Sequence, residues 1–171
     1  MEITHVNKVR EFMNKAGQPI PERPTVPDEA TARARASLVI EEALELLDAL
    51  GYMFFSTREK EPDGSIKVNY GITPNGKAPD LEKIADGVAD VCVVANGTAL
   101  ACGIDPTQIQ SAVDDSNLDK FRGDAHMNEA GKWIKPSDWV KPDIVGILKV
   151  QGCERPKCCG GTCKKEGGDG C

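Results

Sequence analysis

The chain has 171 residues, of which 40% are hydrophobic and 28% charged, and its formal net charge is −6. This composition is typical of an ordinary soluble protein with one core, and the acidic balance argues against a general nucleic-acid binder. No stretch approaches the roughly 18 consecutive apolar residues of a membrane span, and no basic segment followed by an apolar run opens the chain. We therefore expect a cytoplasmic protein that binds neither nucleic acid nor membranes, with its seven cysteines reduced.

The first third of the chain predicts two helices joined by a connector. Apolar residues recur at helical spacing over residues 2–16, and Gly17 is the expected helix end. Four prolines between residues 17 and 30 favour an extended connector. Acidic residues that suit the positive end of a helix dipole then begin a second helix, predicted over residues 28–50 and ending at Gly51.

The next segment, residues 51–80, is less regular and allows two interpretations. An Asp63-Gly64 turn signal lies between an apolar run and an alternating run, which is typical of a small β-hairpin. A polar loop punctuated by Pro and Gly is the alternative.

The second half predicts further helices at residues 81–102 and 106–121 and a short one at 142–148, with a polar loop over 123–142. Together these elements predict an all-α helix bundle of four to five helices with a small hairpin insertion. We expect this domain to occupy residues 1–150 and a cysteine-rich tail to follow it.

Acidic residues gather on two of the predicted helices. Glu45 lies four residues after Glu41 and three after Glu42 on one helix, where like charges repel. Asp86 and Asp90 lie one turn apart on another helix. Carboxylate oxygens are the ligands that Mg²⁺ prefers, so these five residues predict a site for Mg²⁺, or for Mn²⁺ in its place. A solvated acidic helix face is the alternative.

Such a site suits the hydrolysis of a phosphoanhydride. Two metal ions would orient a water molecule and neutralise the oxygens that gain charge. Glu41 or Glu42 would act as the general base on that water.

Several motifs together resemble one enzyme family. These are Glu41-Glu42-x-x-Glu45, the later Asp86 and Asp90, Gly103-Ile104-Asp105, and Ser116-Asn117-x-x-Lys120. The pattern is similar to the all-α nucleoside triphosphate pyrophosphohydrolases of the MazG-like and phosphoribosyl-ATP pyrophosphohydrolase-like branch, over about residues 5–148. The family motif continues with Glu-x-x-Asp, and here Gly87 stands where that Glu is expected, so Asp86 is our substitute ligand.

The resemblance implies Mg²⁺-dependent hydrolysis of a nucleoside triphosphate to a monophosphate and pyrophosphate. It implies a nucleotide contact for Asn117 and a phosphate contact for Lys120, and we expect Lys132 and Lys135 to close over the phosphates. Related bundles build their pockets with a partner subunit, so we expect a homodimer or homotetramer. For the two tryptophans we expect packing rather than base stacking.

Three alternatives remain open. Two are narrower substrates, phosphoribosyl-ATP and dUTP or dUDP. The third is a non-catalytic metal- or nucleotide-binding interaction protein, in which the change to Gly87 has abolished turnover.

The last segment, residues 151–171, lacks apolar residues and carries five of the seven cysteines. It is a flexible tail, a soft-metal site or a disulfide-bonded segment. The soft-metal interpretation is a Zn²⁺ site formed by four thiolates, Cys153, Cys158, Cys159 and Cys163. The other two cysteines, Cys92 and Cys102, are expected to be buried in an apolar helix.

Overall fold

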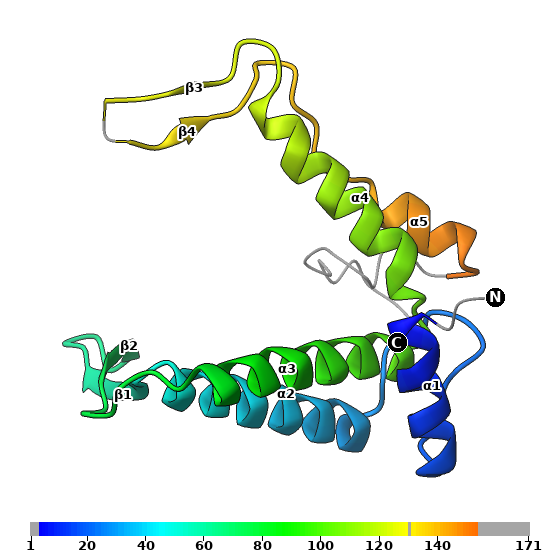
Figure 1. Ribbon diagram of the computed structural model, residues 1–171, viewed down its shortest axis with the longest axis horizontal. Coiled ribbons are helices and arrows are strands. Elements are labelled where there is room, and N and C mark those ends of the chain that lie inside the picture. Colours follow the sequence, from blue (N-terminus) through cyan, green and yellow to red (C-terminus); the bar gives the residue numbers. More distant parts are fainter. Residues whose placement is uncertain (1–3, 130, 154–171) are drawn as a thin grey trace. The chain divides into compact units, whose positions relative to one another are not determined.

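A computed structural model describes residues 4–129 and 131–153 of the chain. The described chain is predominantly helical (Figure 1). Its elements, in chain order, are α1 (His5–Lys15), α2 (Glu29–Ala49), β1 (Tyr52–Lys60), β2 (Ile66–Pro74), α3 (Leu81–Ala101), α4 (Pro106–Leu118), the 3-10 turn η1 (Asp119–Phe121), β3 (His126–Met127), β4 (Trp133–Ile134) and α5 (Ile144–Val150).

The chain divides into two compact units. One unit is Pro27–Thr98, which contains α2, the β1–β2 hairpin and most of α3. The other unit is formed by the described residues before and after it, with α1, α4, α5 and the short β3–β4 ladder. Each predicted helix is present, but the two antiparallel ladders mean that the fold is mostly helical rather than all-α.

The helices begin and end where their capping residues predict. Asp28 caps α2, because its Oδ1 accepts a hydrogen bond of 2.7 Å from the backbone N–H of Thr31. Gly51 follows the end of α2 with φ of +85°, and a Cβ there would lie 2.8 Å from the carbonyl oxygen of Lys77. The position therefore requires glycine both for its left-handed conformation and for the close approach of the chain that leads into α3.

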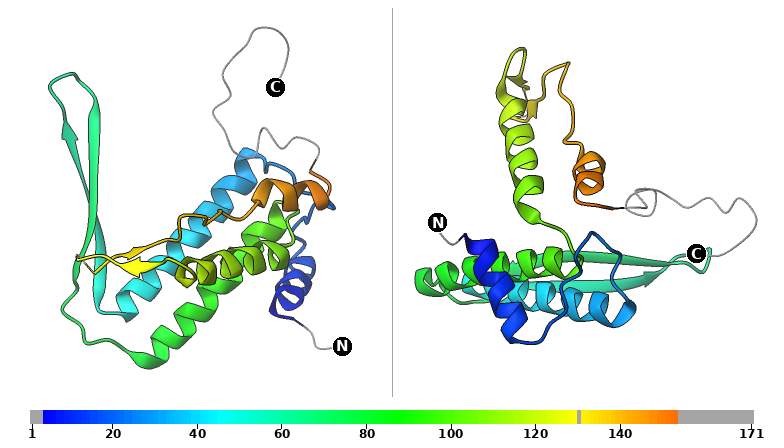
Figure 2. Two further views of the ribbon diagram at one scale, coloured as in Figure 1. Left: turned by 90° about the horizontal axis from the view of Figure 1, so that it is seen from above. Right: turned by 90° about the vertical axis from the view of Figure 1, so that its right-hand side faces the viewer.

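The hairpin is present and is longer than the sequence indicated. β1 and β2 pair over nine residues each, from Tyr52 opposite Pro74 to Lys60 opposite Ile66. Figure 2 shows the hairpin extending away from the ends of α2 and α3. The alternative of a polar loop is therefore wrong, because the alternating residues of β2 do find a partner strand.

An ion pair closes the base of the hairpin. Lys77 Nζ lies 2.8 and 2.7 Å from the two carboxylate oxygens of Asp48, and Asn75 Nδ2 donates to Asp48 Oδ1 at 2.9 Å. The backbone N–H of Asp80 donates to the carbonyl of Ala49 at 3.0 Å. These contacts join the end of α2 to the segment that begins α3.

The other unit departs from prediction in the segment before α5. A polar loop was expected there, yet β3 and β4 form a two-pair antiparallel ladder in which His126 faces Ile134 and Met127 faces Trp133. The ladder escaped prediction because two residues per strand are too few to show alternation. Cys92 also departs from prediction: it is exposed, because a helix with one close neighbour keeps its other faces in solvent.

Within the described residues one helix, α3, is long and apolar enough by length and composition to cross a membrane, with a mean hydropathy of 1.4. The core helices of soluble proteins meet the same criterion. Length and composition are by themselves weak evidence for a membrane span, and α3 also carries Asp86 and Asp90 and lies alongside α2.

Candidate active site

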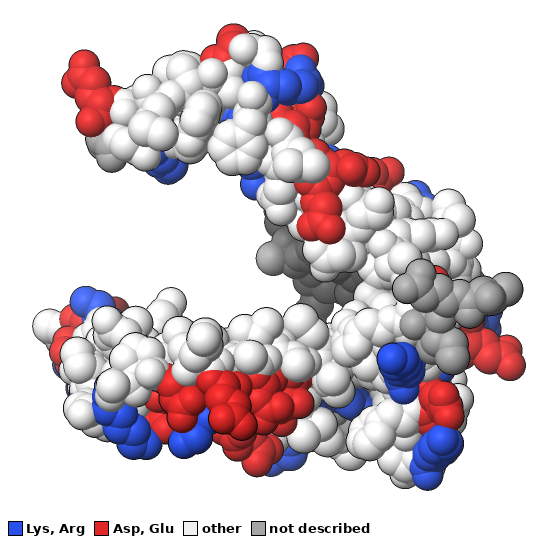
Figure 3. Space-filling model, in the orientation of Figure 1, with Lys and Arg blue, Asp and Glu red and all other residues white. Residues whose placement is uncertain are grey.

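The five predicted metal-binding carboxylates lie on the two long helices of the Pro27–Thr98 unit. We call them the acidic cluster: Glu41, Glu42 and Glu45 on α2, with Asp86 and Asp90 on α3. Figure 3 shows acidic side chains gathered over these two helices. Residues some forty positions apart are brought together because the hairpin returns the chain alongside α2 (Figure 2).

Glu42 experiences the charge of the whole cluster. Partial burial, followed by the negative charges of Asp90, Glu45, Glu41 and Asp86, raises the pKa of Glu42 above its ordinary value. Each of the other four carboxylates therefore lies close enough to disfavour ionisation of Glu42. A carboxylate with a raised pKa is also a better proton acceptor, which suits a general base.

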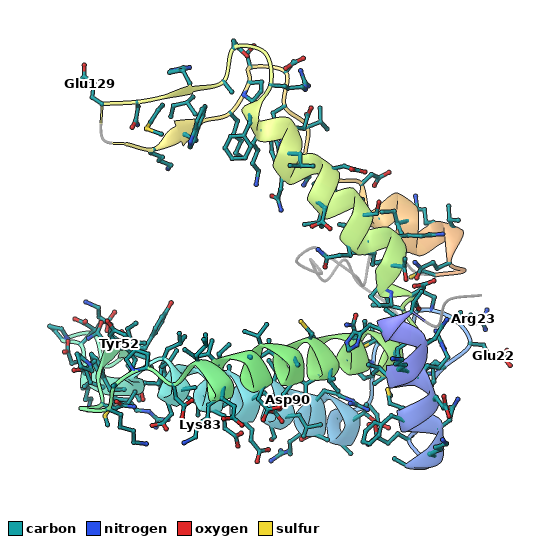
Figure 4. All side chains as sticks on the ribbon, viewed as in Figure 1. Glu22, Arg23, Tyr52, Lys83, Asp90 and Glu129 are labelled. Atoms are coloured by element: carbon teal, nitrogen blue, oxygen red, sulfur yellow. The ribbon has the colours of Figure 1, made fainter. Side chains whose placement is uncertain are left out.

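A groove of about 410 Å³ runs beside the cluster. Glu45, Asp86 and Asp90 line it together with Asp48 and Lys83, and Leu44, Ala49 and Gly87 complete its wall. Figure 4 shows Lys83 and Asp90 on the same side of the helix pair. The sequence reasoning missed Lys83 and Asp48. Lys83 lies three residues before Asp86, and Asp48 lies three residues after Glu45, so helical spacing places each on the same helix face as its neighbour and would have identified both.

Gly87 explains why the carboxylate expected at this position is missing. Gly87 is buried, and a Cβ built there would lie 3.3 Å from Cα and from Cβ of Leu46 on α2. Any larger side chain at position 87 would require Leu46 to shift by a few tenths of an ångström, and a glutamate there would add its carboxylate to this tight contact. Asp86, one position earlier, is exposed, lines the groove and acts on Glu42.

The donor set of the acidic cluster fits a hard divalent cation in chemistry and in charge. Among residues 4–129 and 131–153, however, no three His, Cys, Asp or Glu side chains converge closely enough to hold one ion. Coordination by the cluster therefore requires rotamer changes in carboxylates that are exposed or half-buried.

Three of the four predicted substrate-binding residues meet in the other unit, around Trp139. Lys120 Nζ donates to Asn117 Oδ1 at 2.7 Å and lies 5.6 Å from the centre of the Trp139 ring, and Lys135 Nζ lies 3.7 Å from that centre. Trp139 Nε1 donates to the carbonyl oxygen of Ser116 on α4 at 3.0 Å. We call Asn117, Lys120, Lys135 and Trp139 the lysine–tryptophan cluster.

The fourth predicted residue, Lys132, lies elsewhere. Its backbone N–H donates to Asn128 Oδ1 at 2.8 Å in the turn between β3 and β4. In the part of the chain that the structure describes, its ammonium makes no cation–π contact with Trp139. Trp133 stands in T-shaped contact with Phe121, with ring centroids 5.1 Å apart.

The predicted soft-metal site falls mostly outside the described residues. Cys153 is buried just after α5, where its backbone N–H donates to the carbonyl of Leu148 at 2.9 Å. The other three predicted ligands, Cys158, Cys159 and Cys163, lie outside the described residues.

A comparison with protein-family models finds one family, described as phosphoribosyl-ATP pyrophosphohydrolase, which matches residues 9–117. The matched segment contains the whole acidic cluster and ends at Asn117, before the two lysines and the tryptophan of the other cluster. A search of curated proteins finds no match.

Proposed function

Because the chain belongs to the phosphoribosyl-ATP pyrophosphohydrolase family, whose members are hydrolases that act on a nucleotide, we propose that it converts a nucleoside triphosphate to a monophosphate and pyrophosphate with Mg²⁺. One water molecule is consumed and one phosphoanhydride bond is broken. The observation that supports this proposal most directly is the acidic cluster, in which partial burial and then the charges of the other four carboxylates raise the pKa of Glu42.

Each of the predicted residues has a role in this proposal. The acidic cluster would hold Mg²⁺, which supplies charge neutralisation for the phosphate oxygens when it is bound. Glu42, or its neighbour Glu41, accepts the proton of the attacking water. Asn117, Lys120 and Lys135 bind the nucleotide and its phosphates.

Two alternatives are favoured by particular observations. The description of the matching family names phosphoribosyl-ATP, which makes that nucleotide the second candidate substrate. A non-catalytic nucleotide-binding role is favoured by Gly87 and by the separation of the carboxylates among the described residues.

Pyrophosphate release separates these proposals. The substrates would be the common nucleoside triphosphates, dUTP and phosphoribosyl-ATP, each with Mg²⁺, with Mn²⁺ and with a chelator. We expect release from at least one nucleotide and a fall of about 10²-fold when Glu41, Glu42 or Glu45 is changed to Gln, which keeps size and removes charge.

The matched control is Glu29→Gln, which removes an exposed charge from the same helix, where Glu29 pairs with Arg33 at 3.2 Å. This variant should keep the parent rate. Release that is unaffected in all three cluster variants would contradict the metal site, and a folded protein that releases pyrophosphate from none of the nucleotides would favour the non-catalytic role.

We also propose a homo-oligomer. In the Pro27–Thr98 unit, Ala49 is the only hydrophobic residue among the described residues that is buried. A unit of this size with so little buried apolar surface requires further contacts to be stable in water.

A further inference from the structure

We propose that the rings of Phe121 and Trp133 form a stacking platform for the nucleobase of the substrate. We call these two rings the aromatic pair. The assignment to a substrate rests on the proposed function, whereas stacking of a free nucleotide on the pair does not. Both residues lie beyond residue 117, where the match to the family model ends, so the inference depends on the contacts of this chain.

The two rings hold each other in a defined arrangement. Their centroids lie 5.1 Å apart with an interplanar angle of 82°, so the edge of one ring meets the face of the other. Contacts of this geometry are favourable between aromatic rings and orient both of them. Phe121 ends η1, and Trp133 begins β4, where it lies opposite Met127. The rings are therefore oriented before a ligand binds.

The aromatic pair leaves much of its surface open to solvent. Trp133 is 45% exposed and Phe121 is 57% exposed. Trp139, by contrast, is half-buried, and its Nε1 donates to the carbonyl oxygen of Ser116. Packing, which the sequence predicts for both tryptophans, therefore accounts for Trp139 better than for Trp133. The contact between the two rings covers only part of each, so aromatic surface remains on which a planar ligand can stack.

The neighbours of the aromatic pair favour a nucleobase over other planar ligands. Phe121 directly follows Lys120, and Trp133 lies two positions before Lys135, a spacing that places two side chains on one side of an extended chain. The ammonium groups of both lysines lie near the Trp139 ring, at 5.6 and 3.7 Å from its centre. The two segments that supply the aromatic rings thus also supply the cations that the proposed function assigns to the nucleotide phosphates. Aromatic rings beside cations match the two ends of a nucleotide, its base and its phosphates.

The ligand class is a purine or pyrimidine base carried on a ribose phosphate. Every base has a π-face, so stacking contributes affinity with little selection among bases. A purine covers more of an aromatic ring than a pyrimidine does, and we expect it to bind about threefold more tightly. The aromatic pair therefore adds affinity for the base without reading its hydrogen-bonding edge.

The fluorescence of Trp133 tests stacking directly. The chain has two tryptophans, so Trp139→Phe keeps an aromatic ring at position 139 and leaves Trp133 as the single tryptophan. Adenosine monophosphate should quench its emission saturably, because a stacked base contacts the indole ring. Ribose phosphate, which has no base, should leave the emission unchanged. Equal effects of the two ligands, or no saturable quenching by adenosine monophosphate, would overturn the inference.

Substitutions in the full-length chain separate stacking from a structural role, with calorimetry as the readout. Trp133→Leu and Phe121→Leu should each weaken the binding of adenosine monophosphate about tenfold, and Trp133→Phe should recover part of the loss because it restores an aromatic face. The Kd of inorganic pyrophosphate with Mg²⁺ should stay within about twofold of the parent value, because stacking contributes nothing to a ligand without a base. Phe121 lies outside the β3–β4 ladder, so Phe121→Leu tests the aromatic pair even where Trp133→Leu disturbs that ladder.

The matched control is Phe12→Leu. Phe12 lies on α1 in the same unit and is 61% exposed, so this variant removes an exposed aromatic ring away from the aromatic pair and should bind adenosine monophosphate like the parent. Equal weakening by Phe12→Leu would show a non-specific effect and contradict the platform. Parallel weakening of pyrophosphate binding in both Trp133→Leu and Phe121→Leu would show a structural role and contradict it as well.

Turnover separates this inference from the proposed function. Trp133→Leu and Phe121→Leu should raise KM for a nucleoside triphosphate and leave kcat largely unchanged, because the base stacks equally in the ground state and in the transition state. Turnover with a parent-like KM in both variants would overturn the platform and leave the proposed function intact. Base-dependent binding of adenosine monophosphate by a chain that turns over no nucleotide would support the platform and contradict the proposed function alone.

Discussion

Asp86 and Asp90 differ at the residue scale, although both belong to α3 and both line the groove. Of the two, Asp90 exerts the larger effect on the pKa of Glu42. If Asp86 replaces the family glutamate as a ligand, Asp86→Asn should weaken Mg²⁺ affinity nearly as much as Asp90→Asn, by about tenfold each. Calorimetric Mg²⁺ titration measures this, and a parent-like titration of Asp86→Asn beside a weakened Asp90→Asn would show that Asp86 is only a surface carboxylate.

The residue types of the acidic cluster were predictable from the sequence, because helical spacing alone places Glu41, Glu42 and Glu45 together. The reason for Gly87 was not predictable. It depends on the contact of that position with Leu46, and spacing within one helix carries no information about the neighbouring helix. The same holds for the distinction between Lys132 and Lys135, which only the position of the Trp139 ring decides.

At the scale of elements, the Asp48–Lys77 pair predicts how the base of the hairpin responds to pH. The hydrogen bond from Lys77 is the main cause that lowers the pKa of Asp48 below its ordinary value of 3.8. A carboxyl whose pKa is lowered by folding contributes stability above its unfolded pKa, and this stability is lost as the pH falls through the folded pKa. Asp48→Asn should therefore lower Tm at pH 7, by about 1–3 °C because the pair is exposed, and the difference from the parent should vanish in acid below the folded pKa.

Thermal unfolding followed by circular dichroism from pH 2 to pH 7 measures this difference. The control is Glu61→Gln, which removes a charge from the turn of the hairpin and should unfold like the parent at every pH. A Tm difference for Asp48→Asn that persists unchanged at pH 2 would mean that the carboxylate charge is not the cause.

The ends of the helices were more predictable from the sequence than the contacts that these helices make with distant parts of the chain. Caps and glycines indicated the ends of α1, α2 and α3 because they act within one turn of the chain. The C-terminal end of the unit that contains α1, α4 and α5 was less predictable. Gln151 exchanges two hydrogen bonds of 3.0 Å with the backbone of Asp105, and Cys153 is buried. Residues 151–153 therefore take part in the fold, just past the predicted boundary at residue 150, through contacts that join distant parts of the sequence.

At the scale of the whole molecule, the hairpin supplies a surface for the proposed homo-oligomer. Its register places six large side chains on one face, with exposed fractions from 41% to 77%: Tyr52, Phe54, Ile66, Val68, Tyr70 and Ile72. The opposite face carries Met53 and Phe55 near the base of the hairpin and the polar residues Thr57, Glu59, Lys67 and Asn69 toward its turn. An isolated two-stranded hairpin is marginal in water, and one with such a face exposes more apolar surface than a monomer usually leaves uncovered.

We propose that a second copy of the chain covers this face, because a two-fold axis would bring the same apolar hairpin face of each copy together. Val68→Asp should therefore lower the molar mass of the parent assembly, measured by light scattering at micromolar concentration. The new carboxylate lies opposite Arg58 in the register, so the hairpin itself should remain folded.

Asn69→Asp is the control, since it adds the same charge one residue along, on the opposite face, and should keep the parent mass. A monomeric parent, or an unchanged mass for Val68→Asp, would show that the hairpin face does not join copies of the chain.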